Sequence, residues 1–138
     1  LETFDGLFAL NVVEHIEDDM LAISNAKKLL RPGGKMVILV PAYQTLYNQL
    51  DKELFHYRRY NKRSLKELFR ANGLTIEKAY YFNFMGIFGW FVSGRLQQNK
   101  IIPSDQLRLY NALVPLFKLI DLLLLRRVGL SVVCVGTK

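Results

Sequence analysis

The stretch FDGLFALNVVEHIEDDMLAISNAKKLLRPGGKMVILVP, Phe4–Pro41, decides the fold of this chain. It begins with a nearly continuous apolar run, Phe4–Leu10, which predicts a strand that is buried on both faces. It ends with a second uncharged run rich in β-branched residues, Met36–Val40, which Pro41 stops. The stretch therefore predicts two strands of one sheet.

A helix is predicted between the two strands. Apolar residues recur at helical spacing from Met20 to Leu30, and either Asp18 or Asp19 can cap the start. We expect the Pro-Gly-Gly turn at 32–34 to end this helix. A strand, a crossover helix and a strand of this length form a right-handed parallel unit. Ligands bind beyond the carboxyl ends of such strands, so residues 11–17 and the segment from Pro41 onward should face any active site.

Two motifs in this unit resemble the class I S-adenosylmethionine-dependent methyltransferases. FDGLFALNVVEHIEDD is similar to the strand of that family that ends in a segment like NVVEHI, and LLRPGGKMVILVP is similar to the motif one helix later. The later segments HYRRYNKRSLKELFRANGL, YYFNFMGIFGW and GLSVVCVGTK resemble a bacterial branch found near glycosyltransferases and lipid or polysaccharide biosynthesis. The resemblance implies a methyltransferase that uses S-adenosyl-L-methionine and a small or a lipid- or saccharide-linked acceptor.

The chain lacks two features of the family that it resembles. Family members bind the cofactor through a glycine-rich turn after the first strand and an acidic residue at the end of the second, and no GxGxG-like pattern occurs in this sequence. The resemblance therefore implies that residues 1–138 are the carboxyl-terminal half of a methyltransferase domain. We expect weak or no cofactor binding by this fragment alone.

The expected fold is α/β, with a partial Rossmann-like sheet made of the fourth to seventh strands of the family. Ser64–Asn72 reads as a helix capped by Ser64, with Glu67 completing a capping box, and 74–82 reads as a strand. The closing strand, 130–137, should insert antiparallel between the strands that begin at Met36 and Leu74. In the family this strand lies between its two predecessors.

A helical insertion, 83–127, precedes the closing strand. Helices are predicted over 83–98 and from Asp105 to about Arg127, with a break at 101–104, and Pro115 either kinks the second helix or starts a new one. Most of the circumference of the second helix is apolar, so it must pack on its own aromatic hairpin, a partner subunit or a membrane surface. No stretch here reads as a helix that spans a membrane.

Charge indicates where a partner would bind. The chain carries 19 Lys and Arg residues and 12 Asp and Glu residues. The segment from Lys52 to Arg70 alone contains seven of the basic residues but only two of the acidic ones. This local excess suits an anionic substrate or phospholipid surface; no signature of nucleic-acid recognition accompanies it, so nucleic acid is not predicted as a partner. The single cysteine, Cys134, lies in an apolar run and reads as a buried residue of a cytoplasmic protein.

Candidate cofactor and catalytic residues follow the first strand. The resemblance places Asn11, Val12 and Val13 along the methionyl part of the cofactor. His15 is a candidate base or acceptor-orienting group, because its ordinary pKa permits proton transfer near neutrality, and His56 is the second candidate. The alternative for His15 is a helix-start histidine bonded to the neighbouring backbone. Two histidines far apart in the sequence, without a ligand-spaced carboxylate cluster, do not predict a metal site.

The long connection 42–62 is the candidate for acceptor recognition, since long loops at this edge of a parallel sheet often carry function. Its aromatic and basic side chains suit anion or sugar recognition by hydrogen bonds, stacking and bidentate pairing. The candidate substrate-binding residues are Tyr43, Tyr47, Arg58, Arg59 and Tyr60. The alternative is that the arginines form a solvated face and the tyrosines cover the sheet.

A second hypothesis for function comes from another class. The chain could serve as a non-catalytic interaction module that docks on a partner or an anionic membrane through its basic loop and apolar helices. A related expectation concerns the first strand, which is central in the resembled fold and lacks its outer neighbour here. We expect the 4–10 edge to be covered by another copy, by an exchanged segment or by the missing half.

Overall fold

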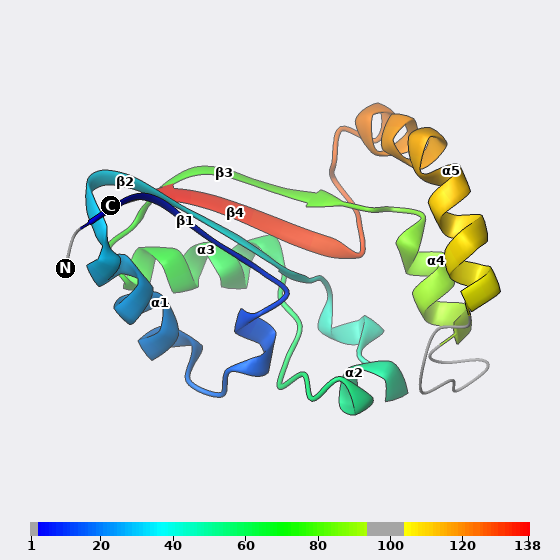
Figure 1. Cartoon of the computed structure of the whole chain (residues 1–138), viewed down its shortest axis with the longest axis horizontal. Helices are drawn as coiled ribbons and strands as arrows, with labels where there is room; N and C mark the ends of the chain where they lie inside the picture. The colour runs from blue at the N-terminus through cyan, green and yellow to red at the C-terminus, as the bar shows by residue number, and fades with distance from the viewer. Residues whose placement is uncertain (1–2, 94–103) are drawn as a thin grey trace.

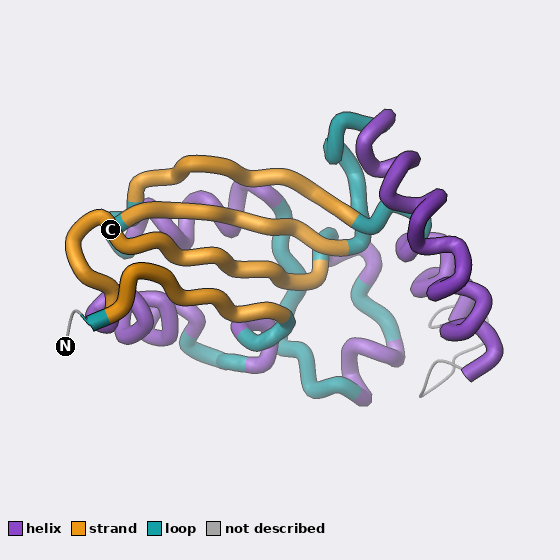
Figure 2. The backbone as a smooth tube through the Cα atoms, turned by 45° about the horizontal axis from the view of Figure 1, so that its top comes forward, coloured by secondary structure: helices purple, strands orange, loops and turns teal. Residues whose placement is uncertain are grey.

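The computed structural model describes residues 3–93 and 104–138, and it builds them around one four-stranded sheet (Figures 1 and 2). The strands are β1 (Phe4–Leu10), β2 (Leu30–Pro41), β3 (Thr75–Phe82) and β4 (Ser131–Thr137), in the order β1-β2-β4-β3. β1 runs parallel to β2, and β4 is antiparallel to both β2 and β3. The predicted partial Rossmann-like α/β sheet and the inserted closing strand are confirmed.

Two helices, α1 (Asp19–Leu29) and α3 (Lys62–Ala71), lie along the same face of the sheet (Figure 1). Alternate residues of β2 point into this layer, as a strand with a period of two requires. The fully buried apolar residues of the core include Ile23, Leu30, Met36, Ile38, Val40, Leu65, Phe69, Val132 and Cys134. The predicted burial of Cys134 is confirmed.

The Pro-Gly-Gly segment does not end α1, so that prediction was wrong. α1 ends at Leu29, and Leu30 already pairs with Phe4, while Gly6 pairs with Lys35. The register shift between these pairs shows that residues 31–34 form an irregularity inside β2. Gly33 adopts a positive φ of 78° and its amide donates to the carbonyl of Lys138. This pairing is non-local, which a local turn signal cannot reveal.

β1 is exposed, in contrast to the predicted strand buried on both faces. It lies at the edge of the sheet and pairs with β2 alone among the described residues. The side chains of Phe4, Phe8 and Leu10 are consequently exposed, and Phe8 reaches 74%. Only the partly buried Leu7 and Ala9 pack against the core.

The predicted start of α3 was wrong by three residues. Asn61 caps the helix, and Ser64 is the third helical residue: the Ser64 amide donates to Asn61 Oδ1, and the Asn61 amide donates to Ser64 Oγ. Asn72 and Gly73 end the helix as predicted. The predicted long connection also contains a short helix, α2 (Gln49–Glu53), which has its own capping box from Asn48.

The insertion forms α4 (Gly86–Phe91) and α5 (Ser104–Leu123), which lie beyond one end of the sheet (Figure 2). Pro115 lies inside α5, which continues through it. Asp121 of α5 is buried and accepts hydrogen bonds from the amides of Asn83 and Phe84, which tie α5 to the segment between β3 and α4. Of the predicted break at 101–104, residues 101–103 lie outside the described residues, and Ser104 begins α5. In the described part of the chain, every helix is too short or too polar to cross a membrane.

Candidate active site

The carboxyl ends of β1 and β2 meet at one edge of the sheet. The amide of Asn11 donates to the carbonyl of Leu39 at 2.9 Å, and Asn11 then turns the chain with a positive φ of 53° into a single 3-10 turn, η1 (Val13–His15). Val13 points into the core, whereas the side chain of Val12 is 46% exposed. Of the three predicted cofactor-binding residues, Asn11 and Val12 therefore face outward at this edge and Val13 anchors the turn.

Glu14 occupies an unusual position in η1. Its side chain is fully buried, and neither carboxylate oxygen has a hydrogen-bond partner among the described residues. Burial raises the pKa of the Glu14 carboxyl above its ordinary value, against the opposing charges of His56, His15 and Arg59. The Glu14 carbonyl accepts a hydrogen bond from the amide of Tyr57, so η1 and the 42–61 loop are held together.

The two histidines are far apart in the sequence but lie side by side in the structure. The ring centroids of His15 and His56 are 4.7 Å apart with planes at 77°, and His15 Nε2 is 4.0 Å from Glu14 Oε1. The side chain of His15 is 38% exposed and that of His56 only 6%. The loop that follows β2 returns to the end of β1, and this long-range contact brings the two predicted catalytic residues together.

Asp51 organises the buried side of the site, although no functional motif in the sequence marks it. Its Oδ1 lies 2.8 Å from His56 Nδ1 and accepts a hydrogen bond from Arg59 Nε at 2.8 Å. Burial works against its charge, but the hydrogen bonds from His56 and Arg59 bring the pKa of Asp51 below its ordinary value. The spacing Asn48-x-x-Asp51, which forms the capping box of α2, was the available sequence signal.

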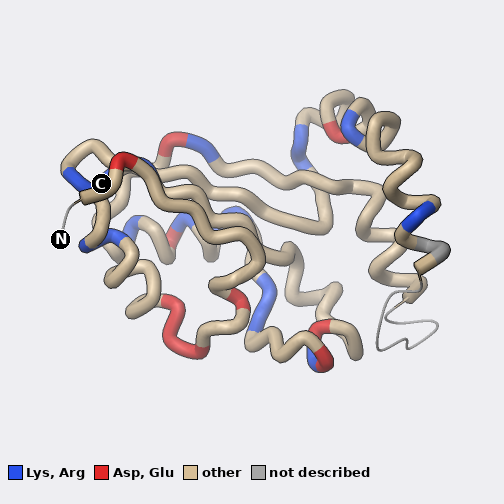
Figure 3. Tube along the Cα trace, in the orientation of Figure 1, with Lys and Arg blue, Asp and Glu red and all other residues tan. Residues whose placement is uncertain are grey.

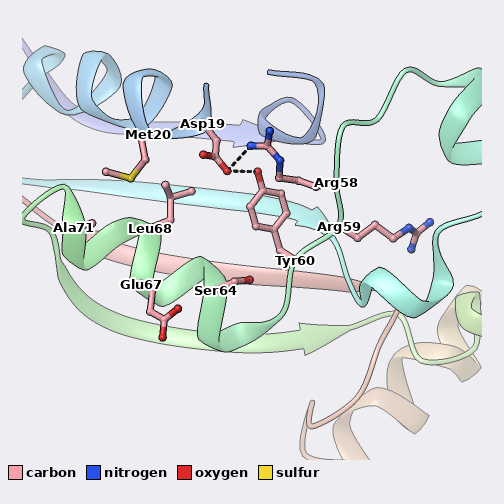
Figure 4. Close-up of a pocket in the computed structure, with 9 residues that line it drawn as sticks. All are labelled: Asp19, Met20, Arg58, Arg59, Tyr60, Ser64, Glu67, Leu68 and Ala71. Carbon is pink, nitrogen blue, oxygen red and sulfur yellow. Dashed lines mark hydrogen bonds and ion pairs between the residues drawn. The ribbon is translucent and has the colours of Figure 1, made fainter. Parts of the chain in front are cut away.

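Arg58 and Arg59 point in opposite directions (Figure 4). Arg59 is buried, donates through Nη1 to the carbonyl of Ala42, and lies over the ring of Trp90 with Cζ 4.6 Å from the centroid. Arg58 Nη1 lies 2.8 Å from Asp19 Oδ2. Both guanidinium groups thus have partners within the chain, so neither forms a wholly solvated face.

Tyr60 joins Arg58 at the first turn of α1. Its hydroxyl donates to Asp19 Oδ2 at 2.8 Å, and burial together with Asp19 raises the pKa of this hydroxyl. These residues line part of a pocket of about 370 Å³ between α1 and α3 (Figure 4). Figure 3 shows the acidic residues at the start of α1 beside the basic residues of the loop. The pairing fixes the loop against α1.

The other two loop tyrosines take separate positions. Tyr47 donates from its hydroxyl to the carbonyl of His56 at 2.7 Å, next to the histidine pair. Tyr43 instead stacks on Tyr81 of β3 with ring centroids 4.8 Å apart, so it covers the sheet. The structure therefore brings His15, His56, Tyr47 and Arg59 into one cluster and leaves Tyr43 apart from it.

Comparisons with known proteins identify the family of this chain. The profile of the family described as "Methyltransferase domain" matches residues 2–79. The chain belongs to this methyltransferase domain family. The resemblance to the class I S-adenosylmethionine-dependent enzymes is thereby confirmed. No curated protein matches the chain by sequence.

Solved structures share the fold of this methyltransferase domain at low sequence identity. A Bacillus halodurans protein provisionally described as a methyltransferase has 16% identity and a TM-score of 0.61, over 99% of this chain and 65% of its own. An Archaeoglobus fulgidus protein described as SAM-dependent has 17% identity and a TM-score of 0.56, over 99% and 60%. Phosphoethanolamine N-methyltransferase 2 of Haemonchus contortus, solved with S-adenosyl-L-methionine, has 17% identity and a TM-score of 0.56, over 99% and 34%. Residues 1–138 therefore cover less than two thirds of the length of each of these three proteins.

A larger cavity lies beneath α5, and the sequence analysis did not predict it. It has a volume of about 720 Å³ and lies between α5 and the strands β2, β3 and β4. Its lining is mostly apolar and aromatic with a few charged groups, and includes Leu39, Tyr80, Phe82, Tyr110, Phe117, Lys118, Asp121 and Arg126. The aromatic residues on β3 and at helical spacing on α5 were the available signal.

The residues at the end of β1 fit one side of S-adenosylmethionine. Exposed apolar side chains gather there, since Leu10, Val12 and Ile16 are 51%, 46% and 36% exposed. Such side chains can pack against the apolar parts of the cofactor.

Proposed function

We propose that the protein carrying this methyltransferase domain transfers a methyl group from S-adenosyl-L-methionine to an acceptor at the carboxyl edge of the sheet. One observation carries the proposal: the family match covers β1, β2 and the turn between them that holds NVVEHI, and that turn lies at this edge. The cofactor supplies an activated methyl group, so the contribution of the protein is mainly to bind and orient the two reactants.

Some residues of the domain would contact the cofactor, and others would face the acceptor. Asn11 and Val12 would contact the methionyl part of the cofactor, with Val13 fixing the turn from the core. His15 is the histidine that a bound acceptor can reach, because its side chain is half-exposed, whereas the buried His56 supports it from behind. Tyr47 and Arg59 hold His56 and Asp51 in place. This arrangement suits the orientation of an acceptor by hydrogen bonding.

Residues 1–138 would form the carboxyl-terminal half of the cofactor site, with the helical insertion 83–127 on the acceptor side. The sequence lacks the glycine-rich turn that holds the cofactor in the family. The fragment by itself should therefore bind S-adenosyl-L-methionine weakly or not at all, while the complete protein should bind it. Micromolar affinity of residues 1–138 alone, measured by calorimetry, would contradict this division of the site.

The acceptor that we favour is lipid-linked with an anionic group, in preference to a free saccharide. The cavity under α5 is largely apolar and has Lys118 and Arg126 in its lining. The outward face of α5 carries apolar side chains that the rest of the described chain leaves exposed, among them Leu109, Leu116, Leu119, Leu122 and Leu123. Together they suit peripheral contact with an anionic membrane. The match to a methyltransferase family does not favour a purely non-catalytic interaction module.

The cofactor part of the proposal is tested by titrating the complete protein with S-adenosyl-L-methionine in a calorimeter. We expect saturable binding, and we expect Val12→Asp to weaken it at least tenfold, since the substitution places a charge beside the cofactor. Val128→Asp is the matched control, because Val128 is 40% exposed and precedes β4 rather than following β1. Equal loss in both variants, or an unchanged affinity of Val12→Asp, would refute the assigned position.

The membrane part is tested by co-sedimentation with vesicles of phosphatidylcholine and phosphatidylglycerol. The complete protein should sediment with anionic vesicles, and the double variant Leu116→Glu, Leu123→Glu should stay in the supernatant. Leu54→Glu is the matched control, as Leu54 is 48% exposed in the loop after α2. Failure of the wild-type protein to sediment would remove the membrane part and leave the cofactor part standing.

A further inference from the structure

The carboxylate of Glu14 is the starting point, because it is fully buried and both of its oxygens lack a hydrogen-bond partner within residues 3–93 and 104–138. Buried polar groups in folded proteins are almost always paired, and a carboxylate is among the most costly groups to bury alone. Its nearest basic neighbours are imidazoles rather than a hydrogen-bonding lysine or arginine. A cationic ligand would satisfy it.

Two imidazoles lie beside this carboxylate. His15 comes from the same 3-10 turn, and His56 comes from the loop after α2, so distant parts of the chain converge here. One ligand atom from each of Glu14, His15 and His56 lies within 4.8 Å of the other two. His15 Nε2 and Glu14 Oε1 are 4.0 Å apart. Two histidine nitrogens and one carboxylate oxygen are a common set of metal ligands.

Asp51 holds His56 in the orientation that a metal ligand needs. The buried Asp51 carboxylate also pairs with Arg59, so it acts as an acceptor and His56 Nδ1 carries the proton between them. The other ring nitrogen, Nε2, is then the one left to coordinate an ion, and the described residues give it no hydrogen bond. A carboxylate behind a histidine is the usual means of fixing the tautomer and orientation of a metal ligand.

We infer that Glu14, His15 and His56 bind a divalent transition-metal ion. Magnesium and calcium prefer all-oxygen sites, whereas two imidazoles favour ions such as zinc, nickel or cobalt. In a tetrahedral site, metal–ligand bonds of about 2.1 Å place the ligand atoms roughly 3.4 Å from one another, so the 4.0 Å separation of His15 Nε2 and Glu14 Oε1 must close by about 0.6 Å. His15 is half-exposed and can rotate, and the ion enters from its side.

The ion would have open coordination positions, because the part of the chain that the structure describes supplies three ligands. The site lies at the carboxyl edge of the sheet, next to the turn at Asn11. If the proposed function holds, these positions face the acceptor and can bind its hydroxyl or amine group. This last step rests on the proposed function, but binding of the ion itself does not.

The test is a titration of the complete, chelator-treated protein with Co²⁺, in the absence of cofactor and acceptor. We expect saturable binding in the micromolar range, with visible d–d absorbance from nitrogen and oxygen ligands, and displacement by Zn²⁺. Glu14→Gln and His15→Asn should each weaken Co²⁺ binding at least tenfold. The matched control Glu67→Gln removes an exposed carboxylate of α3 and should bind Co²⁺ like the wild type.

A second readout needs no substitution in the buried part of the site. In the wild-type protein, bound Co²⁺ should shift and broaden the imidazole proton resonances of His15 and His56, which His15→Asn assigns. No saturable Co²⁺ binding up to millimolar concentration, unshifted imidazole resonances, or preferential binding of Mg²⁺ would overturn the inference. Because cofactor and acceptor are absent from both measurements, failure here leaves the methyltransferase proposal untouched.

Discussion

Asp51 and Arg59 form an ion pair inside the protein: Oδ1 and Nε are 2.8 Å apart, and the two side chains are 0% and 1% exposed. Removing one partner of a buried pair leaves an uncompensated charge, which typically costs about 3–5 kcal/mol. Arg59→Met should therefore lower the free energy of unfolding by about this amount in urea denaturation. Because Met keeps much of the volume of the Arg side chain, this loss of stability would come mainly from the missing charge.

The exposed pair Arg63 and Glu67 provides the control for this prediction. Its side chains are 88% and 58% exposed, and such pairs contribute little to stability. Arg63→Met should leave the urea midpoint unchanged within error. Equal midpoints for Arg59→Met and Arg63→Met would show that the interior of the 42–61 loop is not organised around Asp51.

Packing of α3 on the sheet depends on a glycine in β4. A Cβ atom at Gly136 would lie 2.7 Å from Cδ1 of the buried Phe69 ring and 3.1 Å from the carbonyl oxygen of Thr75. Gly136→Ala should destabilise the protein by about 1–3 kcal/mol, since overpacking displaces the core. Gly89→Ala in α4 is the matched control: it meets no atom within 4 Å and should be neutral or slightly stabilising. Thermal unfolding should show a lower melting temperature for Gly136→Ala than for the wild type, and no decrease for Gly89→Ala.

The thiol of Cys134 should make stability depend on alkaline pH. Burial raises its pKa from the ordinary 9.0 to about 11. The folded state therefore holds the proton more tightly than the unfolded state. The resulting contribution, about 2–3 kcal/mol for such a shift, is fully present below pH 9.0 and is lost as the pH rises to about 11. Relative to Cys134→Ala, the wild type should lose unfolding free energy over this range; parallel pH profiles would contradict the burial of the thiol.

The exposed edge of β1 should drive self-association of the isolated chain. Its outward side chains are apolar, and Phe8 is 74% exposed at an edge that has no described strand beside it. In sedimentation velocity, residues 1–138 should form dimers or larger species that Phe8→Lys reduces to monomers. Phe55→Lys, at a position 81% exposed in the loop, should not have this effect. A wild-type chain that stays monomeric at high concentration would argue against coverage by a second copy.

The strands and the strand order were predictable, because the apolar runs and the family motifs are local signals. The residue that caps α3 could not be predicted in this way. Both Asn61-x-x-Ser64 and Ser64-x-x-Glu67 fit a capping box, and the choice depends on tertiary contacts such as the hydrogen bond from the Lys62 amide to the Tyr81 hydroxyl. The irregular part of β2 likewise depends on pairing with residues near both ends of the described chain.

The site was only partly predictable for a related reason. The sequence marks His15, His56 and the basic loop as candidates, but it does not show that the loop returns to the end of β1. Arg58 and Arg59 are neighbours in the sequence, yet their side chains pair with different acids, Asp19 and Asp51 respectively. The local pattern at Asp51 predicts only a helix cap.

Photo-crosslinking tests the central claim, which is that the turn after β1 forms one wall of the cofactor site. The complete protein is irradiated with S-adenosyl-L-methionine labelled in its methyl group, and the labelled peptide is identified by mass spectrometry. The account predicts saturable labelling within residues 10–17, which excess S-adenosylhomocysteine prevents and Val12→Asp reduces. Labelling confined to other parts of the protein, or no protected labelling at millimolar cofactor, would contradict it.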